Sequence, residues 1–98
     1  MNRAEIIAKL RKHEPELTAL GILRLSVFGS VARDDASQQS DIDLMGDFDR
    51  TKRLTLFDMA GLEVRLADIL GASVDLCDRR MLKDPVRIRA EREAVLAF

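Results

Sequence analysis

Two short motifs, each attached to an apolar segment, constrain this 98-residue chain more than any other feature. Gly29-Ser30 ends one apolar run, and Asp41-Ile42-Asp43 opens a second one after ten further residues. Because side chains alternate between the faces of a strand, Asp41 and Asp43 are expected on one face and Ile42 on the other. Two carboxylates ~7 Å apart on one face repel each other unless a cation lies between them. The pair therefore predicts a site for a hard divalent ion such as Mg²⁺, which binds oxygen ligands and bridges to substrate phosphates.

Gly29-Ser30 supplies the second half of such a site. Glycine permits a sharp turn at the end of the strand, and Ser30 is predicted to cap the short helix that follows. The free amides at that helix start and the serine hydroxyl can bind a phosphate. Taken alone, a Gly-Ser pair is usually a turn with a helix cap, and Asp-x-Asp usually marks a solvated strand edge or loop. At this spacing, the combination provides the minimum apparatus for nucleotidyl transfer, in which metal ions clamp the attacking and leaving oxygens.

The composition indicates one small domain over residues 1–98. Hydrophobic residues make up 47% of the chain, which is enough for one modest core but not for a second lobe. The net charge of −1 does not favour direct nucleic-acid binding, which requires a basic surface. The sequence shows no signal peptide and no membrane-spanning run, so a cytoplasmic location without membrane contact is expected by default. The single cysteine, Cys77, excludes an internal disulfide and is expected to be a small buried side chain.

Apolar periodicity and capping signals predict a succession of helices and strands. The expected elements are helices over residues 3–12, 15–20 and 55–70, strands over residues 23–28, 42–48 and 74–77, and a last helix with Asp84 as its cap and Pro85 in its first turn. This order predicts an α/β domain in which helices pack on a small mixed sheet. The candidate site is expected at the ends of the first two strands.

A lone acidic residue interrupts the third predicted strand. Asp75 lies between Val74 and Leu76 and therefore points to the face opposite both of them. One interpretation is an edge-strand charge in water. The other interpretation makes Asp75 a third acidic ligand beside Asp41 and Asp43. It is favoured because a carboxylate without a partner is rare in a short apolar strand.

The spacing of the two motifs resembles the signature of the DNA polymerase β nucleotidyltransferase superfamily. Residues 28–33 (FGSVAR) and 40–44 (SDIDL) resemble its smallest branch, the minimal nucleotidyltransferases or MntA-like antitoxins, and the resemblance covers nearly the whole chain. It implies the minimal polymerase β-like nucleotidyltransferase fold. It also implies two groups of site residues, a metal-binding and catalytic group of Asp41, Asp43 and Asp75 and a nucleotide-binding group of Gly29, Ser30, Arg33 and Ser40.

The same resemblance implies a substrate and a partner. Antitoxins of this branch act on a HEPN-domain ribonuclease toxin, with which they form a complex, and transfer AMP from ATP to a tyrosine of that toxin. The alternative is an antitoxin that inhibits the toxin by binding only. A third possibility is a subunit of a small-molecule nucleotidyltransferase, which would need a companion chain with a substrate pocket. The intact acidic set favours the enzyme, because a pure binder gains nothing from clustered carboxylates without partners.

The chain departs from the family pattern at one place near the Gly-Ser motif. Family members often carry glycine after the Ala-Arg pair, whereas this chain has Asp34 followed by Asp35. The two added negative charges either weaken the binding of a triphosphate or face water. The sequence leaves both alternatives open.

Overall fold

The computed structural model describes residues 1–34 and 41–98, and it contains a single four-stranded sheet with helices on both faces. The strands are β1 (Ile22–Phe28), β2 (Ile42–Phe48), β3 (Val74–Asp78) and β4 (Val95–Leu96). The α-helices are α1 (Arg3–Lys12), α2 (Glu14–Ala19), α3 (Gly29–Ala32), α4 (Leu56–Leu70) and α5 (Val86–Glu93), with 3₁₀ turns η1 (Arg50–Lys52) and η2 (Arg79–Met81).

The sheet is mixed, as the sequence predicts. Its strand order is β3-β2-β1-β4, with β1 antiparallel to both β2 and β4, and β2 parallel to β3. The antiparallel register places Phe28, the last residue of β1, opposite Asp43 near the start of β2. The parallel register places Asp43 opposite Asp75. The predicted site residues therefore lie at the adjacent ends of three neighbouring strands.

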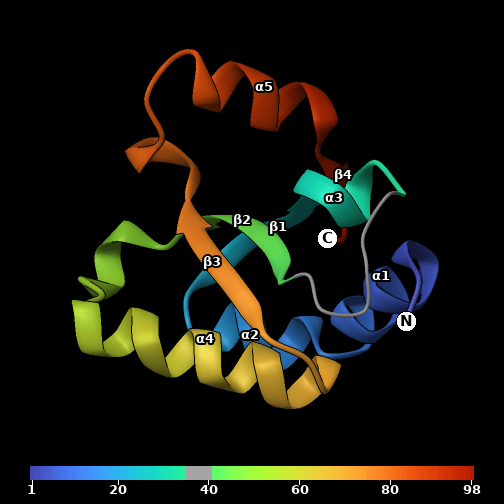
Figure 1. Cartoon of the computed structure of the whole chain (residues 1–98). Helices are drawn as coiled ribbons and strands as arrows, with labels where there is room; N and C mark the ends of the chain where they lie inside the picture. The colour runs from blue at the N-terminus through green and yellow to red at the C-terminus, as the bar shows by residue number, and fades with distance from the viewer. Residues whose placement is uncertain (35–40) are drawn as a thin grey trace.

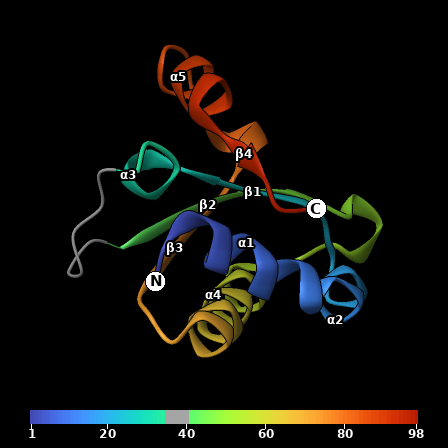
Figure 2. The same cartoon turned by 90° about the vertical axis from the view of Figure 1, so that its right-hand side faces the viewer.

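The helices form two layers around this sheet. Figure 2 shows α1, α2 and α4 on one side and α3 and α5 on the other. The hydrophobic core lies between the first layer and the inner sheet face, where fully buried side chains include Ile6, Leu10, Leu17, Leu25, Val27, Leu44 and Leu66. Helices α3 and α5 lie over the opposite, outer face of the sheet (Figure 1).

Helix α4 illustrates how local sequence signals set the element bounds. Thr55 is its N-cap, and a capping box links Thr55 with Asp58: the Thr55 hydroxyl accepts from the Asp58 amide, and the Asp58 carboxylate accepts from the Thr55 amide. Gly71 ends the helix with a left-handed φ of 66°, where glycine has no steric penalty. Leu62, Leu66 and Leu70 are buried at spacings of four, so the apolar stripe of this helix is core.

Removal of the capping hydroxyl is expected to destabilise the domain measurably. Thr55→Ala should lower the free energy of unfolding by about 1 kcal/mol, the usual contribution of a side-chain cap. The Thr55 amide holds the pKa of the Asp58 carboxyl below its usual range. The stabilisation by the Asp58 carboxylate, whose backbone donor Thr55→Ala retains, is therefore present at neutral pH and is lost as the pH falls through that lowered pKa. Urea denaturation measures the loss, and Thr55→Ser, which keeps the hydroxyl, should unfold like the wild type.

Two features at the C-terminal end differ from the sequence prediction. Strand β4 is not predicted, because two residues are too few to show a strand period; it forms through ladder bonds with β1. The prediction that Asp84 caps the last helix is wrong, since the N-cap position belongs to Pro85 and α5 begins at Val86. The Asp84 carboxylate instead accepts a hydrogen bond from the Arg87 guanidinium and forms an ion pair with it.

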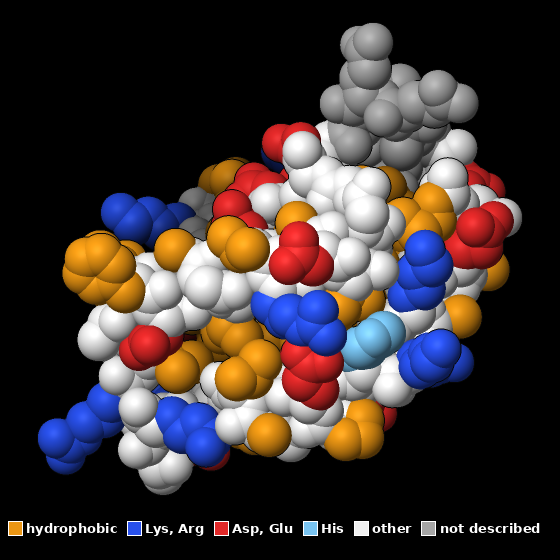
Figure 3. Space-filling model, turned by 90° about the horizontal axis from the view of Figure 1, so that it is seen from below, with side chains coloured by type: hydrophobic (Ala, Val, Ile, Leu, Met, Phe, Trp, Pro, Cys, Tyr) orange, Lys and Arg blue, Asp and Glu red, His pale blue; other side chains and the backbone are white. Residues whose placement is uncertain are grey.

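The face that carries α4 has no single charge sign. On this face, basic and acidic side chains are interspersed with small apolar patches (Figure 3). Such mixing gives little net field over this face. Within the described ranges, none of the helices is both long and apolar enough to span a bilayer.

Candidate active site

Asp43 and Asp75 lie side by side on the outer face of the sheet. They are paired residues on adjacent parallel strands, and their apolar neighbours Leu44 and Leu76 are buried on the inner face. Asp41 precedes β2 by one residue and is exposed, as is Asp75, whereas Asp43 is partly buried. The alternation predicted for Asp41, Ile42 and Asp43 is therefore confirmed, and Asp75 lies next to this pair.

The electrostatics of Asp43 report this clustering. Burial raises the pKa of its carboxyl, and the carboxylates of Asp75 and Asp41 raise it further, while the Arg33 guanidinium lowers it. Mutual repulsion of this kind is relieved when a cation is bound between the carboxylates. The cluster is thus chemically suited to a hard cation, since all three donors are carboxylate oxygens.

The side chains are not already arranged around one point. In residues 1–34 and 41–98, no three His, Cys, Asp or Glu side chains converge as a ready-made metal site. Asp41 and Asp75 are exposed, and the donor set fits Mg²⁺ by its carboxylate chemistry and by the pairing of Asp43 with Asp75 on adjacent strands.

Gly29 lies against the carboxyl group of Asp43. Its φ of 72° is left-handed, and a Cβ atom added there would overlap Asp43 Oδ2 and lie only 3.1 Å from Asp43 Cγ. Glycine is therefore required twice at this position, once by the backbone conformation and once by the space that the carboxylate occupies. The Gly-Ser turn and the Asp-x-Asp strand thus form one continuous site.

Ser30 occupies a different position from the predicted one. Helix α3 begins at Gly29 and has Phe28 as its N-cap without a side-chain hydrogen bond, so the prediction that Ser30 caps this helix is wrong. The left-handed glycine makes the turn at the end of the strand itself, and the helix therefore starts two residues earlier than predicted, with Phe28 instead of Ser30 as its cap. Ser30 lies in the first turn, where backbone amides have no partner within the helix.

Arg33 is the C-cap of α3 and forms an ion pair with Glu93 of α5 at 3.0 Å. Its charge lowers the pKa of the Asp43 carboxyl, against the stronger effects of burial and of the two neighbouring carboxylates. Asp34, which follows the Ala-Arg pair, is exposed and has a left-handed φ of 65°, a conformation that aspartate tolerates better than most residues. Ser40 and Asp35, the other residues predicted near the nucleotide, lie outside the described residues.

Cys77 lies two residues after Asp75, opposite Met45 of β2. Burial raises the pKa of its thiol to about 11, and the carboxylates of Asp75, Asp43 and Asp78 contribute to the rise. A thiol with such a pKa is protonated at neutral pH and is a poor nucleophile. The half-buried position agrees with the predicted structural role of this cysteine.

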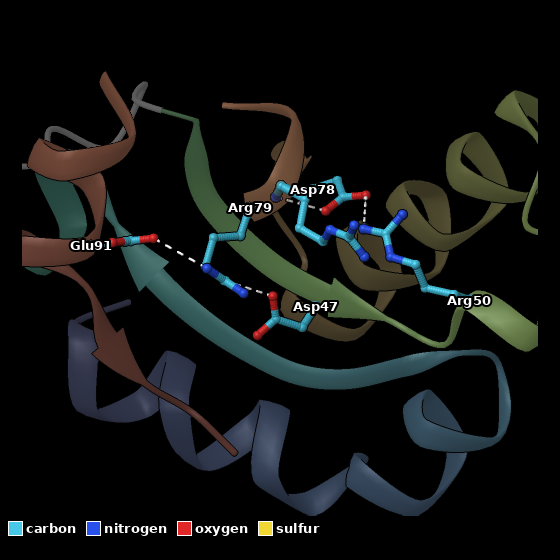
Figure 4. A network of polar contacts seen from close by, with 6 residues as sticks. Asp47, Arg50, Asp78, Arg79 and Glu91 are labelled. Atoms are coloured by element: carbon cyan, nitrogen blue, oxygen red, sulfur yellow. Dashed lines mark hydrogen bonds and ion pairs between the residues drawn. The ribbon is translucent and has the colours of Figure 1, made fainter. Parts of the chain in front are cut away.

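Sequence reasoning missed a polar network on the same sheet face (Figure 4). The Arg79 guanidinium donates to Asp47 of β2 at 2.7 Å and to Glu91 of α5 at 3.3 Å. Next to it, Arg50 forms an ion pair with Asp78 at 3.4 Å. Asp47 lies at an even spacing from Asp43 along β2, and this alternation was the only signal for the network in the sequence. No spacing rule joins Arg79 to a carboxylate 32 positions earlier.

Known proteins resemble this chain in sequence and in fold. The family model described as nucleotidyltransferase domain matches residues 5–97. The protein adenylyltransferase MntA of Thermococcus cleftensis is 36% identical over 92 residues, which are 93% of this chain and 91% of the relative. A solved structure described as a minimal nucleotidyltransferase superposes with a TM-score of 0.81 at 35% identity, covering 97% of this chain and 95% of that one.

Two more distant solved structures share the fold. One is a toxin–antitoxin complex with AMP-PNP, at a TM-score of 0.71 and 24% identity over 100% of this chain and 73% of that chain. The other is an MNT antitoxin in complex with a tri-AMPylated HEPN toxin of Shewanella oneidensis, at a TM-score of 0.61 and 20% identity over 90% and 71%. The family model and the relatives together span nearly the whole chain, and the chain therefore belongs to the nucleotidyltransferase domain family.

Proposed function

We propose that this chain is an antitoxin that transfers AMP from ATP to a tyrosine hydroxyl of a cognate HEPN-domain ribonuclease toxin. The observation that carries the proposal is the contact between Gly29 and Asp43, which joins a candidate phosphate-binding turn to a candidate metal-binding strand. The relative named protein adenylyltransferase MntA supports the reaction, and the fold shared with an MNT antitoxin bound to an AMPylated HEPN toxin supports the partner. ATP as the nucleotide is supported by the AMP-PNP complex of the same fold.

The proposed roles of the site residues follow from their positions. The first-turn amides of α3 and the Ser30 hydroxyl bind the β- and γ-phosphates, and Arg33 offsets part of their charge. Asp41, Asp43 and Asp75 hold Mg²⁺, which would neutralise charge on the reacting phosphates. Asp75 is exposed and is paired with Asp43 on the neighbouring strand, and it accepts the proton of the attacking hydroxyl. The products are the AMP-modified toxin and pyrophosphate.

The first test is the mass of the toxin. After incubation of the purified pair with ATP and MgCl₂, the intact mass of the toxin should increase by one or more AMP groups. Chelation of the metal with EDTA should prevent the increase. An inhibited toxin of unchanged mass would instead establish the antitoxin as one that acts by binding only.

A further inference from the structure

A pocket of about 570 Å³ lies on the outer sheet face next to the acidic cluster. Its floor comes from the middle of β1 and β2, where Ser26 and Met45 are paired residues and both are buried. Leu96 of β4, which is 42% exposed, forms one wall, and Arg24 and Arg79 lie among the lining residues. A pocket of this size is in the range that accommodates a large side chain together with part of its backbone.

The pocket continues the candidate site along the same two strands. Met45 is two residues from Asp43 on β2, and Ser26 is two residues from Phe28 on β1, so the floor begins about 7 Å from the acidic cluster. Gly29 lies on the other side of the Phe28–Asp43 pair. The order along the sheet face is therefore phosphate turn, acidic cluster and pocket.

Arg79 connects the sheet to helix α5 across the pocket. Its guanidinium joins Asp47 of β2 to Glu91 of α5, so one side chain connects the floor with the helix above it (Figure 4). Asp47 and Glu91 both line the pocket, and their charges are balanced by Arg79 and Arg24. The lining thus has no net charge and offers apolar area on Met45 and Leu96.

We propose, on the basis of the proposed function, that this pocket receives the acceptor segment of the partner protein and seats its aromatic side chain on Met45 and Leu96. In an in-line displacement at phosphorus, the attacking oxygen approaches from the side opposite the leaving group. Since the pyrophosphate leaves on the Gly29 side, the attacking oxygen arrives from the pocket side. It forms a bond to the α-phosphorus, the bond from that phosphorus to the bridging oxygen breaks with its electron pair going to pyrophosphate, and the hydroxyl proton passes to Asp75. An aromatic ring with a terminal hydroxyl matches a pocket in which Met45 and Leu96 offer apolar surface and whose Met45 end adjoins Asp43.

The test measures separately how a substitution in the pocket affects the toxin and how it affects ATP. Leu96→Arg places a long charged side chain in the pocket, and Leu23→Arg is the matched control, because Leu23 is a β1 leucine of similar exposure (54%) that does not line the pocket. Steady-state rates of AMP transfer to the co-expressed HEPN toxin give KM for the toxin and for ATP, and calorimetry gives the affinity for Mg-ATP. Leu96→Arg should raise KM for the toxin at least about tenfold, the effect of a central interface contact, with Mg-ATP affinity unchanged. Leu23→Arg should change neither.

Any other outcome with folded variants overturns the inference. Weaker Mg-ATP binding with an unchanged KM for the toxin would assign the pocket to the nucleoside, and no change in either would leave it outside the reaction. If circular dichroism shows that Leu96→Arg is unfolded, Leu96→Ala is measured, with a smaller rise in KM for the toxin expected and an unchanged KM as the contradicting result. A wild-type chain that modifies no toxin would refute the proposed function itself, whereas a wild-type rate with an insensitive pocket refutes only this inference.

Discussion

Asp43→Asn is expected to abolish AMP transfer while the domain stays folded. Asp43 is the partly buried member of the acidic cluster, and it is the one that the carboxylates of both Asp41 and Asp75 influence. A neutral amide cannot hold a divalent cation against competing phosphate oxygens. Loss of metal-assisted charge stabilisation amounts to several kcal/mol, so the rate should fall by at least about a thousandfold.

The stability of this variant should not fall with its activity. Removal of one charge from a group of three carboxylates relieves repulsion, so thermal unfolding is expected at or slightly above the wild-type temperature. Rates are measured as transfer of labelled AMP to the toxin. Asp75→Asn should show a smaller loss, because Asp75 is exposed and lies at the side of the cluster. An Asp43→Asn chain that transfers AMP at the wild-type rate would refute the assignment of the acidic cluster.

Gly29→Ala should have the second largest effect, and the chain offers a matched control. Gly29 and Gly71 have nearly equal left-handed φ values, 72° and 66°, so alanine costs about 1–2 kcal/mol of backbone strain at either position. A Cβ atom at Gly71 meets nothing within 4 Å, whereas one at Gly29 overlaps the Asp43 carboxylate. Only Gly29→Ala should therefore displace the acidic cluster, and a displacement of about 1 Å can cost a hundredfold in rate.

Urea denaturation and Mg-ATP calorimetry distinguish the two glycine variants. Both should lose stability, but only Gly29→Ala should lose nucleotide binding and transfer. Equal Mg-ATP affinities in the two variants would mean that the Gly-Ser turn has a structural role alone.

Much of the fold could be predicted from short-range signals. The helix over residues 3–12 and the strand over residues 42–48 have the predicted bounds, because apolar periodicity identifies both, and the capping box and the final glycine fix α4 within one residue. The outward face of Asp43 followed from alternation alone. Strand β4 could not be found in this way, since its two residues are ordered by ladder bonds with β1.

The candidate site could be predicted in its parts but not in its assembly. Gly29 and Asp43 were recognisable as motifs, yet their contact arises from the antiparallel register that pairs Phe28 with Asp43. The position of Ser30 depended on where the helix begins, which the left-handed conformation of Gly29 decides. The bridge from Arg79 to Asp47 and Glu91 joins three distant segments, so only the tertiary structure could reveal the pocket beneath α5.

The most direct test of the proposed activity is whether neutralisation of the toxin outlasts the antitoxin. The toxin is incubated with this chain, ATP and Mg²⁺, separated from it under denaturing conditions, refolded, and assayed for ribonuclease activity. Toxin incubated without ATP and carried through the same steps is the control for refolding. A phosphodiester bond to a side chain does not dissociate with the complex, whereas an inhibitor that only binds is released. The account predicts an active control and an inactive ATP-treated toxin; full ribonuclease activity in both samples would contradict it.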